Sequence, residues 1–174
     1  MDRDDLHHDR AEARDEPPVV DSPASFASAL QWGFARAIDR GARRIVAVDA
    51  DFAAWPLDDP ALLERLGAWL RRPQRELVLL AATFDEMPRR HPRFVAWRQP
   101  RAHAIPGWQA PDDLDVPLPT LLLDDGPLLV RLIDPARWRG RASLDARAAK
   151  LQRDEIDALL QRSEPAFPAN QLGL

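Results

Sequence analysis

The chain has 174 residues, no cysteine and a formal net charge of −4. The lack of cysteine excludes disulfides, thiolate nucleophiles and cysteine metal sites, and it fits a cytoplasmic location. The first residues are charged rather than apolar, which argues against a secretory signal. No apolar run approaches the roughly 20 residues that a membrane helix needs, so no membrane partner is expected.

The net charge is concentrated at the start of the chain. Residues 1–18 hold seven acidic side chains and three arginines, which together account for all of it. This composition, ending in two prolines, predicts a disordered acidic leader over residues 1–20 and a single domain over residues 21–174. Because the rest of the chain is neutral, nucleic acid is expected to be an unlikely partner. A local basic run from Arg89 to Arg101 is interpreted as solvated surface.

The first predicted elements alternate between helix and strand. Asp21 or Ser22 can cap a helix whose apolar residues repeat at helical spacing as far as Gly41. The run from Ile45 to Val48 is rich in β-branched residues, as buried strands are. A second helix opens at Asp59 and a second buried strand covers residues 76–83. This order predicts a parallel pair with a right-handed crossover.

The next predicted elements are shorter and end in a long loop. A short helix is expected over residues 93–97 and a strand over residues 101–105. Five breakers make residues 106–119 a loop, of a length that is often functional or mobile.

The last predicted elements are a hairpin and a helix. Two apolar runs flank Asp125 and Gly126, which predicts an antiparallel hairpin. Ser143 can cap a final helix that ends before Pro165, and Phe167 is expected to pack against the domain.

In this order the elements resemble one half of the phospholipase D-like superfamily, over about residues 22–165. The phrase LQRDEIDALLQRSEP with its leucine-ending tail is also similar to an uncharacterised family of bacterial phospholipase D-like domains. The resemblance implies an α/β fold with a mixed, mostly parallel sheet flanked by helices on both faces.

Active members of that superfamily carry a His-x-Lys-x4-Asp motif, whose positions fall here on Leu118, Thr120 and Asp125. Leucine offers neither a lone pair nor a proton, so covalent and acid/base catalysis both fail there. The only lysine of the chain, Lys150, lies on the final predicted helix. The resemblance therefore implies a pseudoenzyme with a binding or accessory role, without cofactor or metal. Because active relatives with one motif per chain dimerise, it also implies a homodimer or an unknown protein partner.

A second hypothesis is a Mg²⁺-dependent phosphatase similar to the haloacid dehalogenases. Its acids and threonine would follow successive strands, where open α/β sheets place their sites. Against it, the turn at residues 52–55 lacks the glycine or threonine that lets backbone amides approach a phosphate. The candidate residues are Asp49, Asp51, Thr83, Asp124 and Asp125.

A third hypothesis is a protein interaction module that uses an exposed apolar patch around the loop at residues 106–119. Trp108 and Trp138 fall in predicted loops and are the candidate aromatics for a ligand or partner, because exposed aromatic side chains favour binding sites.

Overall fold

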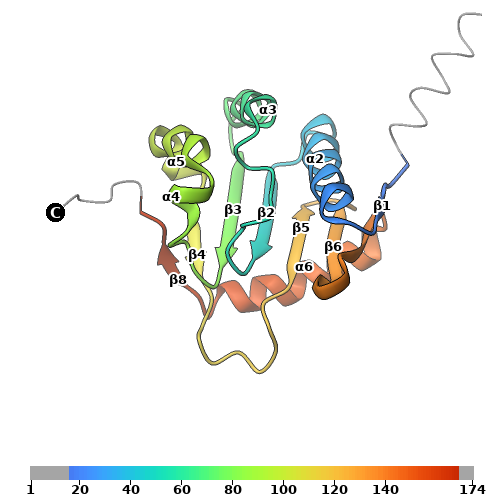
Figure 1. Ribbon diagram of the computed structural model, residues 1–174. Helices are drawn as coiled ribbons and strands as arrows, with labels where there is room; N and C mark the ends of the chain where they lie inside the picture. The colour runs from blue at the N-terminus through green and yellow to red at the C-terminus, as the bar shows by residue number, and fades with distance from the viewer. Residues whose placement is uncertain (1–15, 169–174) are drawn as a thin grey trace, which may run out of the picture.

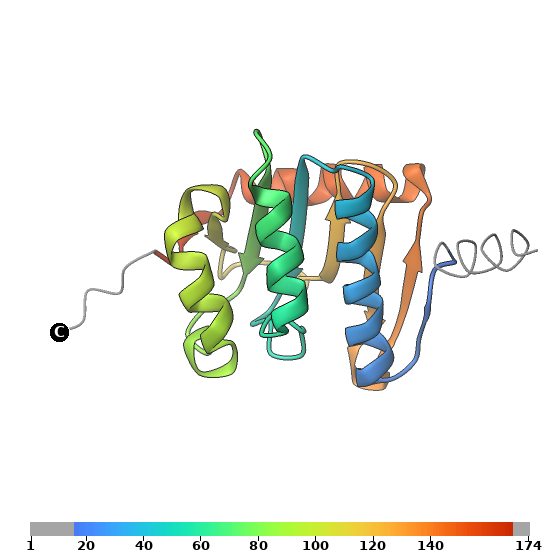
Figure 2. The same ribbon diagram turned by 90° about the horizontal axis from the view of Figure 1, so that it is seen from above.

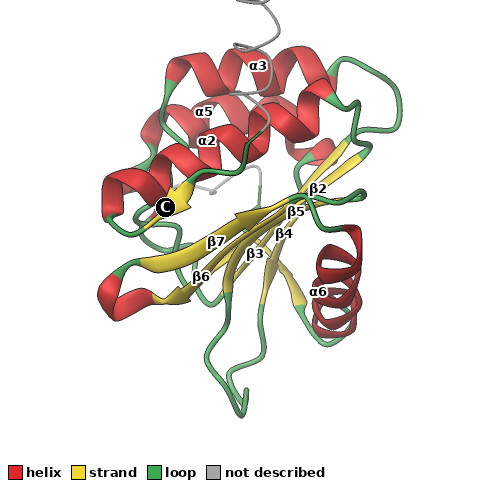
Figure 3. Cartoon of the chain, turned by 90° about the vertical axis from the view of Figure 1, so that its right-hand side faces the viewer, coloured by secondary structure: helices red, strands yellow, loops and turns green. Residues whose placement is uncertain are grey.

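The computed structural model describes residues 16–168. These residues form an eight-stranded mixed sheet with the strand order β1-β7-β6-β5-β2-β3-β4-β8. Helices lie on both faces of this sheet, as Figures 1 and 3 show. In chain order the elements are β1 (Val19–Val20), α2 (Pro23–Asp39), β2 (Arg44–Asp49), α3 (Pro60–Leu70), β3 (Glu76–Ala81), α4 (Met87–Arg90), α5 (Pro92–Arg98), η1 (Gln99–Ala104), β4 (Gly107–Gln109), β5 (Thr120–Asp124), β6 (Leu129–Asp134), η2 (Pro135–Arg137), β7 (Arg139–Ser143), α6 (Ala146–Leu160) and β8 (Glu164–Ala166).

The α/β class is confirmed, but the prediction that the sheet is mostly parallel is wrong. Within residues 16–168, only the pairs β2–β3 and β3–β4 are parallel. The other neighbouring strands pair antiparallel. The reason is chain geometry: β5, β6 and β7 follow one another through turns too short for the crossover that a parallel pair requires.

Helices α2, α3 and α4–α5 lie side by side on one face of the sheet, here called the α2/α3/α5 face (Figure 2). Ser22 caps α2 in a capping box with Ser25, as predicted for this position. A Cβ atom at Gly33 would come within 2.9 Å of the Leu122 side chain, so glycine lets α2 lie directly on β5. The core here includes fully buried Phe34 and Leu79.

The opposite face, here called the α6 face, carries one helix. Its core contains Val48, Leu80, Leu121 and Leu123 from the strands and Ile156 from α6. Leu114 and Leu118, from the loop between β4 and β5, pack partly buried against the same core. The α6 face is therefore covered by one helix and one loop, whereas three helical segments cover the α2/α3/α5 face.

Several sequence predictions differ from the structure at element boundaries. The strand predicted over residues 101–105 lies within η1, where Arg101 donates to the Trp97 carbonyl and stacks on the Trp97 ring. Trp108, predicted in a loop, belongs to β4. Ser143 ends β7, and Asp145 instead caps α6 by accepting from two backbone amides.

The boundary of the predicted leader also changes. Val19 and Val20 form β1, which pairs with β7. Residues 1–15 of that leader lie outside the described residues.

Other local predictions are confirmed. β2 and β3 are parallel, and β5 and β6 form an antiparallel hairpin. Phe167 stacks on Phe84 with 4.9 Å between ring centroids. Among the described residues, no helix is long and apolar enough to cross a membrane.

Candidate functional site

The strand ends at which β2 and β3 finish and β5 begins lie together on one side of the sheet, here called the Asp49 edge. Open α/β sheets place ligands at such an edge. Asp49 is 9% exposed, and its carboxylate is fully engaged. One oxygen accepts from the amides of Asp51 and Phe52, at 3.4 and 2.7 Å. The other accepts from the Thr120 hydroxyl.

These bonds hold the turn that follows β2 in an unusual conformation. Phe52 has a φ of 60°, in the left-handed region that costs a non-glycine residue energy. Its amide binds Asp49, while its carbonyl accepts from the ring Nε2 of buried His91 at 2.8 Å. Its side chain is fully buried and meets Trp55 edge to face at 5.1 Å. Asp49 therefore supports a packed turn rather than a phosphate-binding loop.

The remaining candidates at the Asp49 edge have similar local roles. Asp51 accepts from the Ala53 amide at 2.9 Å. Thr83 accepts from the Asp85 amide at 3.2 Å. Leu118, which the sequence resemblance aligns with the His of the phospholipase D-like motif, packs partly buried against the core of the α6 face. Asp51 and Thr83 therefore each accept a hydrogen bond from a backbone amide two residues further along the chain, and Leu118 has a packing role.

Asp124 and Asp125 lie at the opposite end of the strands from Asp49. The antiparallel register places Asp124 against Ile45, at the start of β2, whereas Asp49 ends that strand. Asp125 binds the backbone of Arg43 through its carboxylate. The structure therefore does not bring together the five residues of the phosphatase hypothesis, and it also separates Asp125 from Leu118 and Thr120.

Asp124 itself is a buried turn residue, 2% exposed. Its carboxylate accepts from the amides of Gly126 and Leu128 at 2.8 and 3.0 Å. Burial raises the pKa of this carboxyl above its usual value, although the two amide bonds oppose the shift. Its role is to close the turn between β5 and β6.

The two candidate tryptophans are both packed against the core. Trp108 lies on β4 against the core of the α6 face. Trp138 has a φ of 54° and lies 5.9 Å from Phe26 between ring centroids. In the loop at residues 110–119, Val116 is the large hydrophobic that is strongly exposed, at 70%. The apolar surface of the interaction hypothesis therefore consists of exposed Val116 beside the partly buried Trp108, Leu114 and Leu118.

The basic run from Arg89 to Arg101 is divided by the fold. Arg89 and Arg93 are exposed, in agreement with a solvated surface, but His91 and Arg98 are buried. Arg98 donates to the Ile105 carbonyl and lies 4.2 Å above the Phe167 ring. Burial lowers the pKa of its guanidinium to about 10. These contacts fix the C-terminal strand β8 to the helices.

A cavity of about 190 Å³ lies beside the stacked rings of Phe84 and Phe167. Its lining is mostly apolar, with Gln99, Gln109 and exposed Asp85 as its polar members. Within residues 16–168, no group of three acidic or histidine side chains could hold a metal ion.

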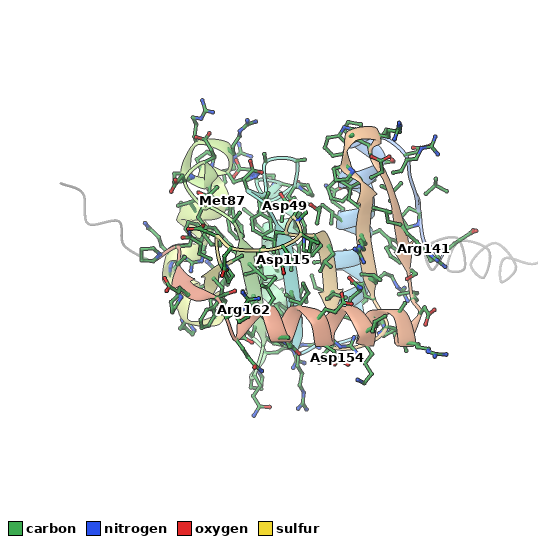
Figure 4. The ribbon with its side chains drawn as sticks, turned by 90° about the horizontal axis from the view of Figure 1, so that it is seen from below. Asp49, Met87, Asp115, Arg141, Asp154 and Arg162 are labelled. Carbon is green, nitrogen blue, oxygen red and sulfur yellow. The ribbon has the colours of Figure 1, made fainter. Side chains whose placement is uncertain are left out.

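Sequence reasoning missed two arginines on neighbouring strands. Arg131 on β6 and Arg141 on β7 are directly opposite one another in the antiparallel register. Arg131 donates to the amide oxygen of Gln152 at 3.0 Å, which is a neutral partner. Alternation along each strand places both side chains on the α6 face, and only the strand register could have revealed the pair. Figure 4 shows Arg141 at the side of the sheet that α6 leaves open.

A mixed eight-stranded sheet between helical layers, with its edge carboxylates used as backbone caps, defines the class of this protein as α/β. No protein-family model matches the chain. No curated protein matches it either.

One solved structure with a similar fold is that of TrmBL2, an archaeal chromatin protein with a novel mode of DNA binding. The two chains superimpose with a TM-score of 0.58 and 15% sequence identity. The match covers 94% of this chain and 60% of TrmBL2, so the chain spans less than two thirds of that protein. At this identity the likeness establishes the fold.

This neighbour overturns the expectation that nucleic acid is an unlikely partner, because a chain of this fold forms part of a protein described as binding DNA. The expectation came from the neutral net charge of residues 19–174. A net charge does not record where arginines gather, as the pair on β6 and β7 illustrates.

Proposed function

We propose that this chain is a phospholipase D-like domain that has lost phosphodiester chemistry and serves as a binding domain. The observation that carries the proposal is Leu118 at the His position of the motif, because it packs against the core of the α6 face and can neither attack phosphorus nor transfer a proton. Asp49 speaks against the rival phosphatase hypothesis, because its carboxylate is occupied by two amides and one hydroxyl.

Nucleic acid is the ligand class that we propose for this binding role. The support is the fold shared with TrmBL2, which is described as a DNA-binding chromatin protein. The arginines on the α6 face provide the positive charge that binding to phosphates requires.

Two hydrolysis assays test the loss of catalysis. Purified full-length protein is incubated with bis-p-nitrophenyl phosphate without metal, and with p-nitrophenyl phosphate in the presence of Mg²⁺. We expect no turnover above that of a heat-denatured sample in either assay. Turnover of the diester that disappears in Asp125→Ala would contradict the proposal. So would turnover of the monoester that disappears in Asp49→Asn and persists in Asp85→Asn, which alters an exposed acid that makes no cap.

A further inference from the structure

The sheet is incompletely covered over β6, β7 and β1 on the α6 face. Helix α6 is anchored near the turn between β5 and β6, where Arg153 donates hydrogen bonds to the carbonyls of Asp124 and Gly126. Three of the four large hydrophobic residues that are most exposed among residues 16–168 surround this uncovered area: Val19 (76%), Ile133 (64%) and Leu151 (60%). In Figure 4, no described helix lies over the strand that carries Arg141.

A groove of about 370 Å³ runs between these strands and the first turns of α6. Its floor includes Leu129, Arg131, Ile133 and Arg141, and its wall is formed from α6. This volume falls within the usual range of small-molecule sites. The groove therefore combines an apolar floor with two guanidinium groups.

Within residues 16–168, no carboxylate forms a salt bridge with Arg131 or Arg141. Like charges directly opposite one another on antiparallel strands destabilise a sheet, because their Cβ atoms lie only about 4.5–5.5 Å apart. The residue on the other side of Arg141, in β1, is Val19. Among the described residues, the salt bridges of the protein use other arginines and Lys150, and Arg141 takes part in none of them.

The acids closest to the groove are already in use. Asp145, which lines it, accepts from the amides of Arg147 and Ala148 at the start of α6. Asp134, at the end of β6, is paired with Arg137. Arg139 lies two residues before Arg141 on the same strand, so its side chain projects toward the same face. Among the described residues, the three arginines 131, 139 and 141 therefore outnumber the acids of this surface, which are Asp145 in the groove lining and Asp134 opposite Arg139.

From this geometry we infer that the groove binds single-stranded nucleic acid, with a backbone phosphate bridging Arg131 and Arg141. This inference rests on the binding role proposed above. An anion between the two guanidinium groups would replace their repulsion by charge-assisted hydrogen bonds. A single strand also exposes the faces of its bases, which the aliphatic surface of Ile133, Val19 and Leu151 can contact. A duplex hides those faces, so it fits the apolar floor less well.

The test is fluorescence anisotropy with a labelled single strand of about 16 nucleotides, the upper end of known site sizes. The double variant Arg139→Glu/Arg141→Glu should weaken binding at least about tenfold at low salt, because it reverses two phosphate-binding charges. The replacement at position 141 places a carboxylate opposite Arg131, whereas the one at position 139 lies opposite Asp134. The urea midpoint of the variant is therefore measured with its affinity, to establish that the variant is folded. The matched control is Arg71→Glu/Arg72→Glu, the same charge change on exposed residues at the end of α3. This control should change the affinity less than about threefold, because charges far from the groove act on the ligand only through screened long-range electrostatics.

Four results would overturn the inference: no binding of the single strand at low salt, an equal loss in the control variant, a duplex that binds as tightly, or polyglutamate that binds as tightly. The last result would identify the groove as a site for an acidic protein segment. The hydrolysis assays are independent of this experiment. If the protein hydrolyses a substrate and the groove still binds the single strand, only the proposed loss of catalysis is wrong. If the protein hydrolyses neither substrate and the single strand does not bind, only the proposed nucleic-acid site is wrong.

Discussion

On the α2/α3/α5 face the strands present fully buried side chains such as Leu122 and Val130, whereas on the α6 face Ile133 and Val19 remain 64% and 76% exposed. The first face carries the aromatic core, with Phe26, Phe34, Phe52 and Phe94 all 1% exposed or less. The second carries a like-charge pair across two strands. The comparison shows that the two faces of one sheet can differ in burial: one face forms a closed core, and part of the other remains exposed to solvent.

The largest expected effect on stability comes from removing a large buried side chain on the α2/α3/α5 face. Phe34→Ala should lower the free energy of unfolding by about 3–5 kcal/mol, the usual cost of the cavity and lost burial. The matched change on the α6 face, Ile133→Ala, should cost less than about 0.5 kcal/mol, as exposed substitutions do. Urea unfolding measures both. Equal losses would show that the α6 face is covered in solution.

The second effect concerns the bonds that Asp49 makes at the edge of the α2/α3/α5 face. Asp49→Ala should lower the free energy of unfolding by about 1–3 kcal/mol, because the buried amide of Phe52 and the Thr120 hydroxyl lose their acceptor. Asp85→Ala, at an exposed acid, should have almost no effect in the same urea titration. A neutral result for Asp49→Ala would mean that its carboxylate does not hold the turn, and the argument against a catalytic role would lose its support.

The third effect is a pH dependence of stability from Asp124. Its raised pKa means that the folded protein binds this proton to a higher pH than the unfolded chain does. The stabilisation that the proton provides is complete below the usual pKa near 3.8 and is lost as the pH rises through the raised value. Asp124→Asn keeps the oxygen that accepts from Gly126 and Leu128 but carries no charge.

The free energy of unfolding of Asp124→Asn, relative to the original protein, should therefore increase as the pH rises across that window. Urea midpoints measured from acid to neutral pH provide the comparison, with Asp85→Asn as the exposed control. A difference between the two proteins that stays constant with pH would contradict the raised pKa.

The smallest effect is a gain in stability on the α6 face. Arg141→Thr removes one member of the like-charge pair and should raise the free energy of unfolding by about 0.2–1 kcal/mol at low salt. The gain should shrink as salt screens the repulsion. Arg71→Thr, an exposed control far from another strand, should show no such dependence on salt. A loss of stability in Arg141→Thr would show that the pair is not repulsive in the free protein.

Features set by neighbouring residues were predictable from the sequence. The cap at Ser22, the buried strands β2 and β3, and the β5–β6 hairpin each depend on patterns within a short window. The position of Asp124 was not predictable, because the direction of β5 against β2 decides which edge it occupies. β1 and β8 have two and three residues, too few to show any periodicity.

The sequence supplied candidates for the site but not their arrangement. That Leu118 and Thr120 replace a catalytic motif stays a prediction, and the structure places Leu118 partly buried against the core of the α6 face. The use of Asp49 as a cap requires the turn at Phe52 to be known in three dimensions. The Arg131–Arg141 pair depends on strand register, which side-chain periodicity leaves undetermined.

The turn at Phe52 joins parts of the chain that are far apart in sequence. Its amide is held by Asp49 of β2 and its carbonyl by His91, between α4 and α5. Since neither bond survives if the turn opens alone, the loop after β2 and the α4–α5 segment form one cooperative unit. We therefore expect amide hydrogens there to exchange with solvent together, and Phe52 to be protected like a residue of the sheet although it lies outside any strand.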